Sequence, residues 1–577
     1  MAESAKPMVE EDIWDFLDTE DMFELDPTSV TTEHSVLSFI DGTSDLKVDL
    51  DGQFPVVQRH GDLSQDATVN HILELENTLL KSTGLGVLPQ SLESLVTPEK
   101  AHDGQQELTN GPDFPDLSPA LQDRLVEIYF HNFHPLCPVI DEIEFSSWYG
   151  SDRLDSNRGR ELLGAINFVA FAHVSDEELG RSSFTSIPEA QRACFRSTKY
   201  MFDKSSQSRP GDVSLVQIAL LLSHWSPFDE SKEVSTYWVD QAFHHATIAN
   251  LSESPEEYSR VIWWCCVART RALALGLRRP DKVTSFEPGR MIQSEDFGSI
   301  AFLARAARMD GKIFEIEAFI ALCKLSDLMY RILLLRKNSG KLSDWRAENP
   351  WLSICKDELN YVVSVDKDLR DWESSHRGLL AKNNIMAQTR CQLLTLQMLR
   401  IVHLSTLMSL YEPYMRCPIQ QRSPAFLLHK ASVERVKETS FAIGDAVQRL
   451  WAVARVEDLP AWFPCWITLP VAVLLVCLGC RHRELQLEAM PVLAPMMEVL
   501  RKMQSRFEGG DYVAKIIESI TRTVDVRVHS WTEEHVISWL PKWLERSPET
   551  LEYQLLARAA QMVRSSFADE TIAVEIV

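Results

Sequence analysis

From residue 117 onward, apolar residues recur every three or four positions along most of the chain. This spacing indicates amphipathic helices, because residues three and four apart share one helix face. The pattern predicts helices at 161–173, 188–202, 213–225, 236–250, 301–336, 344–372, 385–410, 426–454 and 491–507. No useful length of sequence shows the alternation of period two that predicts a half-buried strand. The sequence therefore predicts an all-α protein whose main part is a large multi-helix domain.

The segment 258–280 differs from the other helical patterns, because residues 261–267 are apolar on every side. A helix of this kind must be buried inside a larger assembly of helices. Arginines flank and enter it at Arg260, Arg269, Arg271, Arg278 and Arg279. Buried guanidinium groups need carboxylate or carbonyl partners. Gly276 suits a left-handed exit from the last turn, and Pro280 cannot continue the helix. We interpret this helix as the structural centre of the domain.

The first fifty residues contain 14 acidic residues against two lysines, Lys6 and Lys47. Within them the acids are interleaved with large apolar side chains, chiefly Trp14, Phe16, Leu17 and Phe23. Acidic neighbours keep such side chains solvated until a partner's groove accepts them, so the composition is typical of a disordered activation segment. A disordered leader that only solvates the chain and binds no partner fits the same composition.

The same patterns divide the chain into regions. Residues 1–116 form an acidic leader with little periodicity, expected to be largely disordered. Ser118 and Pro119 supply a cap and a first-turn proline for the first helix, and the helical domain is expected to span 117–510. Residues 511–577 are expected to be a C-terminal helical extension and tail.

The central helix also carries a resemblance to a known family. Arg260-Val-Ile-Trp263-Trp264, then Arg269-Thr270-Arg271 and Gly276-Leu-Arg-Arg279-Pro280, resembles the signature segment of the fungus-specific transcription factor domain. That domain is the all-helical middle homology region of zinc binuclear-cluster regulators. The double-arginine ending and the Trp-Trp-Cys-Cys run are most similar to the branch of the cutinase transcription factors. Thr270 stands where members commonly carry Asp. The resemblance covers about 117–507 and is strongest over 213–280.

A zinc binuclear cluster needs six cysteines within about thirty residues. The 11 cysteines of this sequence begin at Cys137, and no window of that size holds six of them. The formal net charge of −25 also opposes broad contact with a phosphate backbone. We therefore expect no zinc, no other cofactor and no autonomous nucleic-acid binding. Scattered cysteines in apolar segments indicate free thiols in a reducing compartment, and the acid-rich start does not resemble a secretory signal.

Two groups of residues resemble metal ligands. His131, His134 and Cys137 lie close together in sequence, but a structural zinc site needs four ligands. Cys477 and Cys480, followed by His482, form a lone Cys-x-x-Cys, and the apolar residues before them favour buried free thiols. We assign neither group a metal.

Acidic residues in a helical protein also raise the alternative of a Mg-dependent prenyl-diphosphate enzyme. Asp141 with its neighbours resembles an acidic metal motif, and Asn360, Ser364 and Asp368 share one helix face, as Mg coordination requires. The same spacing occurs on ordinary solvated helix faces, which is the interpretation that we prefer. We assign no catalytic residue.

The run 460–480 holds 21 residues without a charge, nearly enough to span a bilayer, and Trp462 and Trp466 suit a membrane interface. Pro464 and Pro470 interrupt it, so a buried core helix is the better interpretation.

Together with the resemblance, these observations predict a nuclear transcription regulator of the fungal zinc-cluster-related type. The resemblance implies that the helical domain regulates activity, by sensing a metabolite or by self-association, and controls a metabolic gene set. The expected partners are coactivators at the leader and a second copy or an intact zinc-cluster regulator, with no membrane. The alternatives are the prenyl-diphosphate enzyme and a non-catalytic dimerisation scaffold.

Overall fold

The computed structural model of the chain describes residues 114–149, 156–225, 235–276, 289–306, 309–348, 356–380, 390–416, 424–479 and 483–504, with 506–507, 513–514 and 517. Within these residues every regular element is helical, so the predicted all-α class is confirmed. The proposed activation residues Trp14, Phe16, Leu17 and Phe23 lie outside the described residues, and the domain boundaries stay a prediction.

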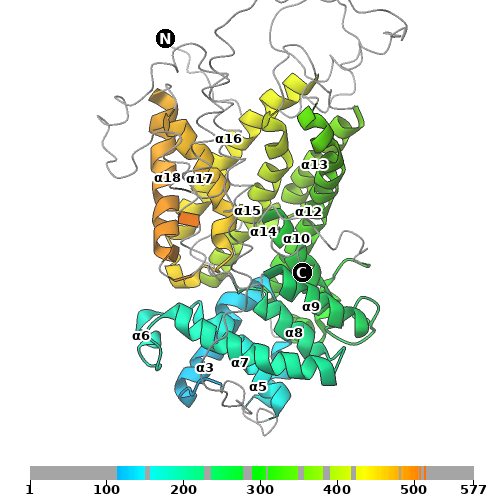
Figure 1. Cartoon of the computed structure of the whole chain (residues 1–577), viewed down its shortest axis with the longest axis vertical. Helices are drawn as coiled ribbons and strands as arrows, with labels where there is room; N and C mark the ends of the chain where they lie inside the picture. Colours follow the sequence, from blue (N-terminus) through cyan, green and yellow to red (C-terminus); the bar gives the residue numbers. More distant parts are fainter. Residues whose placement is uncertain are drawn as a thin grey trace, which may run out of the picture.

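Most of the first group of helices lies in the lower part of Figure 1. It comprises α3 (Pro119–Ile128), the turns η4 (Tyr129–Phe133) and η5 (His134–Leu136), α4 (Glu142–Trp148), α5 (Asn157–Phe171), α6 (Asp176–Leu179), α7 (Ile187–Ser208), α8 (Val213–Leu222), α9 (Ser235–Ile248), α10 (Ser259–Gly276), η7 (Ser294–Phe297) and α11 (Gly298–Ala306). As the sequence predicts, Ser118 caps α3 and Pro119 is its first residue.

The second group lies above it (Figure 1). It comprises α12 (Asp310–Glu348), α13 (Lys356–Ser375), α14 (Arg377–Leu380), α15 (Arg390–Tyr411), η8 (Glu412–Arg416), α16 (Pro424–Trp451), η9 (Val456–Asp458), α17 (Phe463–Gly479) and α18 (Arg483–Gln504). The single helix predicted at 301–336 is two helices, α11 and α12. The last predicted helix begins earlier than expected, at Arg483, and contains Pro491 and Pro495.

The described hydrophobic core consists of two clusters of buried side chains, each formed mainly by one group of helices, although α12 contributes to both. Residues Val261 to Val267 and Leu273 of α10 belong to the first cluster, whereas Ala274 and Leu275 belong to the second. Helix α10 packs against α8 and α9 on one side and against α12 on the other. The central helix of the sequence therefore links the two clusters, and nearly all of its residues are buried.

Helix α17 shows how a proline is accommodated in this core. Because Pro470 has no N–H, the carbonyl of Trp466, four residues earlier, has no helical donor. The hydroxyl of Ser405 on α15 donates to that carbonyl oxygen at 2.9 Å. The helix therefore continues through Pro470, where the sequence predicts an interruption.

Polar contacts join the two groups near η9. The Nδ1–H of His173, just after α5, donates to the carbonyl oxygen of Glu457 at 2.7 Å. The carboxylate of Asp458 accepts from the side chains of Asn132 and Arg390 and from the backbone N–H of Arg455. These contacts connect the first group of helices to the loop that enters α17, and so help to fix the position of one cluster relative to the other.

The indole of Trp264 is fully buried, and its Nε1–H donates to the carbonyl oxygen of Arg290 at 3.1 Å. We expect Trp264→Ala to lower the free energy of unfolding by about 3–5 kcal/mol, as truncation of a core aromatic does. The exposed Phe302 is the matched control, since Phe302→Ala is expected to change stability by no more than about 0.5 kcal/mol. Urea unfolding of the full chain measures both, and equal midpoint shifts would contradict the central role of α10.

Burial, together with a smaller effect of the nearby Arg506, lowers the pKa of His173 to about 4. Between pH 6.5 and 4 the imidazole of His173 is protonated in the unfolded chain but neutral in the folded one. The free energy of unfolding therefore falls as the pH falls. One such proton changes the unfolding free energy by about 1.4 kcal/mol per pH unit. We expect His173→Gln to reduce the slope of stability against pH by about that amount, measured by urea unfolding at pH 7, 6 and 5. An unchanged slope would show that His173 titrates normally.

Candidate functional site

A cavity lies where the two groups of helices meet, and we call it the junction pocket. It contains about 940 Å³ of empty space, part of it open to solvent. Its lining comes from η4 and η5, the end of α8, α10, α12, α15 and the start of α17: Asn132, Phe133, Leu136, Cys137, His224, Cys265, Ala268, Arg269, Ala272, Leu273, Gly276, Phe319, Leu322, Ser326, Met329, Met398, Leu399, Val402, Pro460, Trp462, Cys465 and Trp466. The pocket is therefore built from segments far apart in the sequence.

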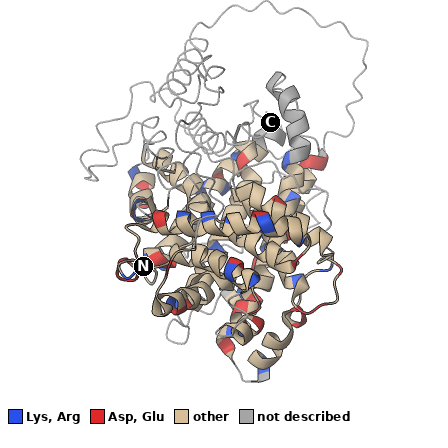
Figure 2. Cartoon of the chain, turned by 60° about the horizontal axis from the view of Figure 1, so that its bottom comes forward, with Lys and Arg blue, Asp and Glu red and all other residues tan. Residues whose placement is uncertain are grey.

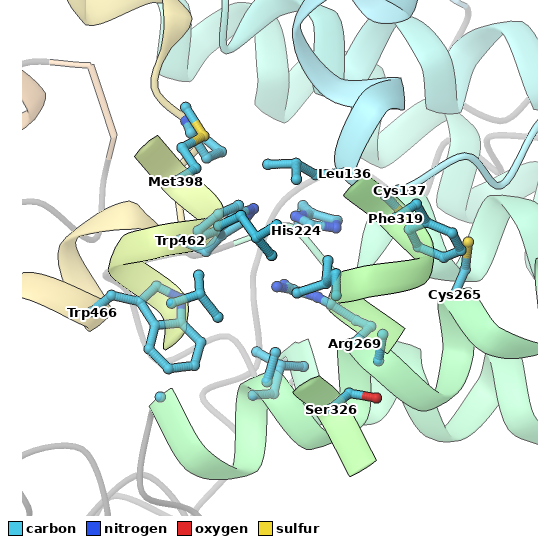
Figure 3. A pocket seen from close by; sticks show the side chains of 18 of the residues that line it. Leu136, Cys137, His224, Cys265, Arg269, Phe319, Ser326, Met398, Trp462 and Trp466 are labelled. Atoms are coloured by element: carbon cyan, nitrogen blue, oxygen red, sulfur yellow. The ribbon is translucent and has the colours of Figure 1, made fainter. Parts of the chain in front are cut away.

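Arg269 supplies the charge of the pocket. Its Nε–H donates to the hydroxyl oxygen of Ser223 at 3.1 Å, and its Nη2 donates to the carbonyl oxygen of Ser223 at 2.8 Å. Ser223 is the C-cap of α8, where unpaired helix carbonyls and the helix dipole favour a cation. Figure 3 shows the nitrogen end of Arg269 beneath His224, within the cavity. The guanidinium is thus held in place by a helix terminus.

His224 lies next to this guanidinium and packs edge-on against Phe133, with ring centroids 4.7 Å apart. Burial lowers the pKa of His224 well below its usual value, and the positive charge of Arg269 acts in the same direction. The imidazole is therefore neutral at physiological pH and offers a hydrogen bond without a second charge.

The opposite wall is apolar and comes from the second group of helices. Trp462 and Trp466, which the sequence suggests as membrane-interface residues, line the pocket together with Met398 on α15 (Figure 3). Gly276 is not among the glycines with positive φ and is still helical, so the predicted left-handed exit is wrong. A Cβ at Gly276 would lie 3.4 Å from the Trp466 ring, an ordinary van der Waals distance.

Thiols occupy the wall of the first cluster. Cys137 and Cys265 share a side-chain hydrogen bond, and burial raises the pKa of the Cys265 thiol well above its usual value. The described cysteines are not joined in disulfide bonds. A buried thiol with a raised pKa remains protonated and acts as a small apolar side chain.

The remaining signature residues lie around the pocket rather than in it. Arg260 forms an ion pair with Asp296, with Nε and Oδ1 3.3 Å apart. The buried Arg271 contacts the carboxylate of Asp327 and lies over the ring of Tyr330, 4.7 Å from its centroid. Trp263 and Trp264 are buried in the first cluster. Arg279 and Pro280 lie outside the described residues.

The metal candidates of the sequence have structural roles where they are described. The ring of His134 contacts the carbonyl oxygen of Ile140, with Nε2 and O 2.8 Å apart, and His131 contributes only its carbonyl oxygen, to the thiol of Cys391. Cys480 and His482 lie outside the described residues. Within the described part, no group of three or more His, Cys, Asp or Glu side chains is arranged to hold a metal ion.

The acidic candidates also have other partners. Asp141 is the N-cap of α4 and accepts from the backbone N–H groups of Ile143 and Glu144. On α13, Asp368 forms an ion pair with Arg331, and the Ser364 hydroxyl accepts from the same guanidinium at 3.2 Å. The guanidinium of Arg331, on α12, therefore occupies the α13 face for which the sequence suggests Mg coordination.

Two apolar segments bear on a membrane interpretation. Residues Val471 to Leu478 of α17 are buried in the second cluster. The segment Arg390–Met415 is long and apolar enough to cross a membrane, but 78% of its most apolar window is buried inside the protein. Burial of this extent is the pattern of a core helix.

Charge does not separate into faces on the side of the molecule shown in Figure 2. Basic and acidic residues alternate along the helices there.

Comparison with known proteins shows which proteins the chain resembles. The chain is 21% identical over 456 residues to the cutinase transcription factor 1 beta of Fusarium vanettenii, covering 71% of this chain and 50% of that protein. It is 29% identical over 176 residues to a transcription factor of Fusarium pseudograminearum, covering 29% of this chain and 19% of that protein. It is 30% identical over 177 residues to the acetamidase regulatory protein of Aspergillus fumigatus, covering 29% of this chain and 22% of that protein.

The protein is thus an all-helical relative of fungal regulatory proteins. Its similarity to the fungal transcription factors, which the signature segment predicts, is confirmed. No family model matches the chain. The chain spans half or less of the length of these three curated relatives.

The contacts of Arg331 predict the response to Mg and farnesyl diphosphate. Because a guanidinium already occupies the face of Ser364 and Asp368, we expect neither compound to shift the melting temperature of the full chain. Ser364→Ala and Asp368→Asn are expected to change stability by about 1 kcal/mol or less, since Asp368 is part of a partly exposed ion pair. A thermal-shift measurement checks this. Stabilisation by the diphosphate that disappears in Ser364→Ala would support the enzyme alternative instead.

Proposed function

We propose that the protein is a transcription regulator that acts in the nucleus and controls a metabolic gene set through its helical domain. The observation that carries this proposal is the alignment of 456 residues with a protein named as a transcription factor. Other relatives are named as an acetamidase regulatory protein and as the sorbicillinoid biosynthetic cluster transcription factor, which supports a metabolic target. These names describe regulators rather than enzymes.

In this proposal the acidic leader recruits a coactivator, and the helical domain controls the activity of the regulator. The leader offers Trp14, Phe16, Leu17 and Phe23 to a coactivator groove, where aromatic and aliphatic side chains provide most of the binding energy. In this proposal the helical domain pairs with a second copy of the chain or with a regulator that carries a zinc cluster, and the zinc-cluster partner supplies DNA contacts.

A reporter assay tests the leader. The full chain tethered to a heterologous DNA-binding domain is expected to activate transcription, and Trp14→Ala with Phe16→Ala is expected to remove most of the activity. Lys6→Ala with Lys47→Ala is the matched control in the same leader and is expected to leave activity intact. A double aromatic variant as active as the unchanged chain would reject recruitment through these side chains. If the tethered chain has no effect on the reporter, the proposed function as a transcription regulator is contradicted.

A further inference from the structure

Helix α11 is apolar on the side that faces solvent as well as on the side that faces the core. Ile300, Ala301 and Ala304 are buried, as expected for the inner face of a surface helix. The outer side carries Phe302 and Leu303, which are 71% and 50% exposed. A helix that covers a core normally presents polar residues to water on its opposite face. The sequence of α11 is therefore that of a helix covered on both sides, and the first cluster covers one of them.

The exposed apolar surface continues past the end of α11. Met309 is 51% exposed, and its backbone N–H donates to the carbonyl oxygen of Ala304, which keeps it beside the last turn of the helix. We call Phe302, Leu303 and Met309 the α11 patch. The remaining large hydrophobic side chains that are exposed in the described chain are spread over α4, α9, α13 and α18. Scattered exposed hydrophobic residues are normal, whereas a group of them marks a surface that contacts another molecule.

The charge around the α11 patch indicates which molecule that is. In the described part of 290–312 the basic and acidic side chains balance: Arg290, Arg305 and Lys312 against Glu295, Asp296 and Asp310. The whole chain has a formal net charge of −25, so two copies repel each other over most faces. A twofold interface brings the same surface of both copies together, and a balanced surface does so without net repulsion. The acidic leader of the same chain gains no net attraction from such a surface.

We infer that the α11 patch is the surface through which two copies of this chain pair, with α11 of each copy against α11 of the other. Phe302 and Leu303 form the apolar centre of the interface. Arg305 and Glu295 lie at its rim, where their side chains are 52% and 69% exposed and 3.4 Å apart in the single chain. Each is therefore available to the opposite charge of the second copy. The inference rests on the proposed function only in so far as that function includes pairing of the helical domain.

Sedimentation equilibrium of the full chain over a range of concentrations tests the inference. We expect a monomer–dimer equilibrium with a Kd of about 10 µM or tighter. Phe302→Glu with Leu303→Glu places charges at the centre of the interface and is expected to weaken the dimer at least about 30-fold, as loss of central apolar contacts does. The urea measurement with Phe302→Ala belongs well below this Kd, where pairing adds nothing to stability.

A matched control adds the same charge elsewhere. Val363 on α13 and Leu487 on α18 are exposed apolar residues outside the patch, and Val363→Glu with Leu487→Glu is expected to leave the Kd unchanged. Met309→Glu alone keeps the centre of the patch and is expected to weaken the dimer by a smaller factor. It decides the matter if circular dichroism shows that the double variant in α11 does not fold.

Three results overturn the inference. The first is a full chain that stays monomeric at every concentration, whether or not another part of the chain then covers the patch. The second is a dimer whose Kd is unchanged in the folded α11 variants. The third is a dimer weakened equally by the α11 variants and by the control, since charge alone then explains the effect.

The reporter assay keeps this inference apart from the proposed function. A chain that activates the tethered reporter but stays monomeric contradicts the α11 interface and leaves the regulator intact. A chain that pairs through α11 but never affects the reporter supports the interface and contradicts the regulator.

Discussion

The arrangement of the described chain depends on the burial of one apolar helix along nearly its whole length. Helix α10 has no polar face to present to water, so other helices must cover it on all sides. It packs against α8, α9 and α12, and its last turn reaches the second cluster. Because α10 and α12 each contribute to both clusters, the two groups of helices share buried side chains.

The arginines on this helix show how charge is tolerated in such a core. Each of the three described ones reaches a different kind of partner: Arg260 an acidic side chain of η7, Arg271 an acidic side chain and a tyrosine ring on α12, and Arg269 the end of α8. Arg269 lines the junction pocket, where the two groups of helices meet.

Some expectations from the sequence fail for local reasons. A proline predicts a helix end because it removes one backbone donor, but Ser405 replaces that donor for the carbonyl of Trp466, and α17 continues. Gly276 predicts a left-handed exit because glycine tolerates one, but it is the last helical residue of α10 and its φ is not positive. In the case of Pro470 the deciding group comes from another helix, and no local pattern records its presence.

The sequence by itself determined the helical class, the burial of the helix around Trp263 and Trp264, and the similarity to fungal transcription factors, because spacing and signature residues are local properties. It also pointed to Arg269, but only as one arginine among several in a motif. The tertiary structure decided that Arg269, His224 and Trp466 line one cavity, because they come from different segments of the chain. Their meeting depends on how the two clusters pack, and packing between distant segments has no periodicity in the sequence.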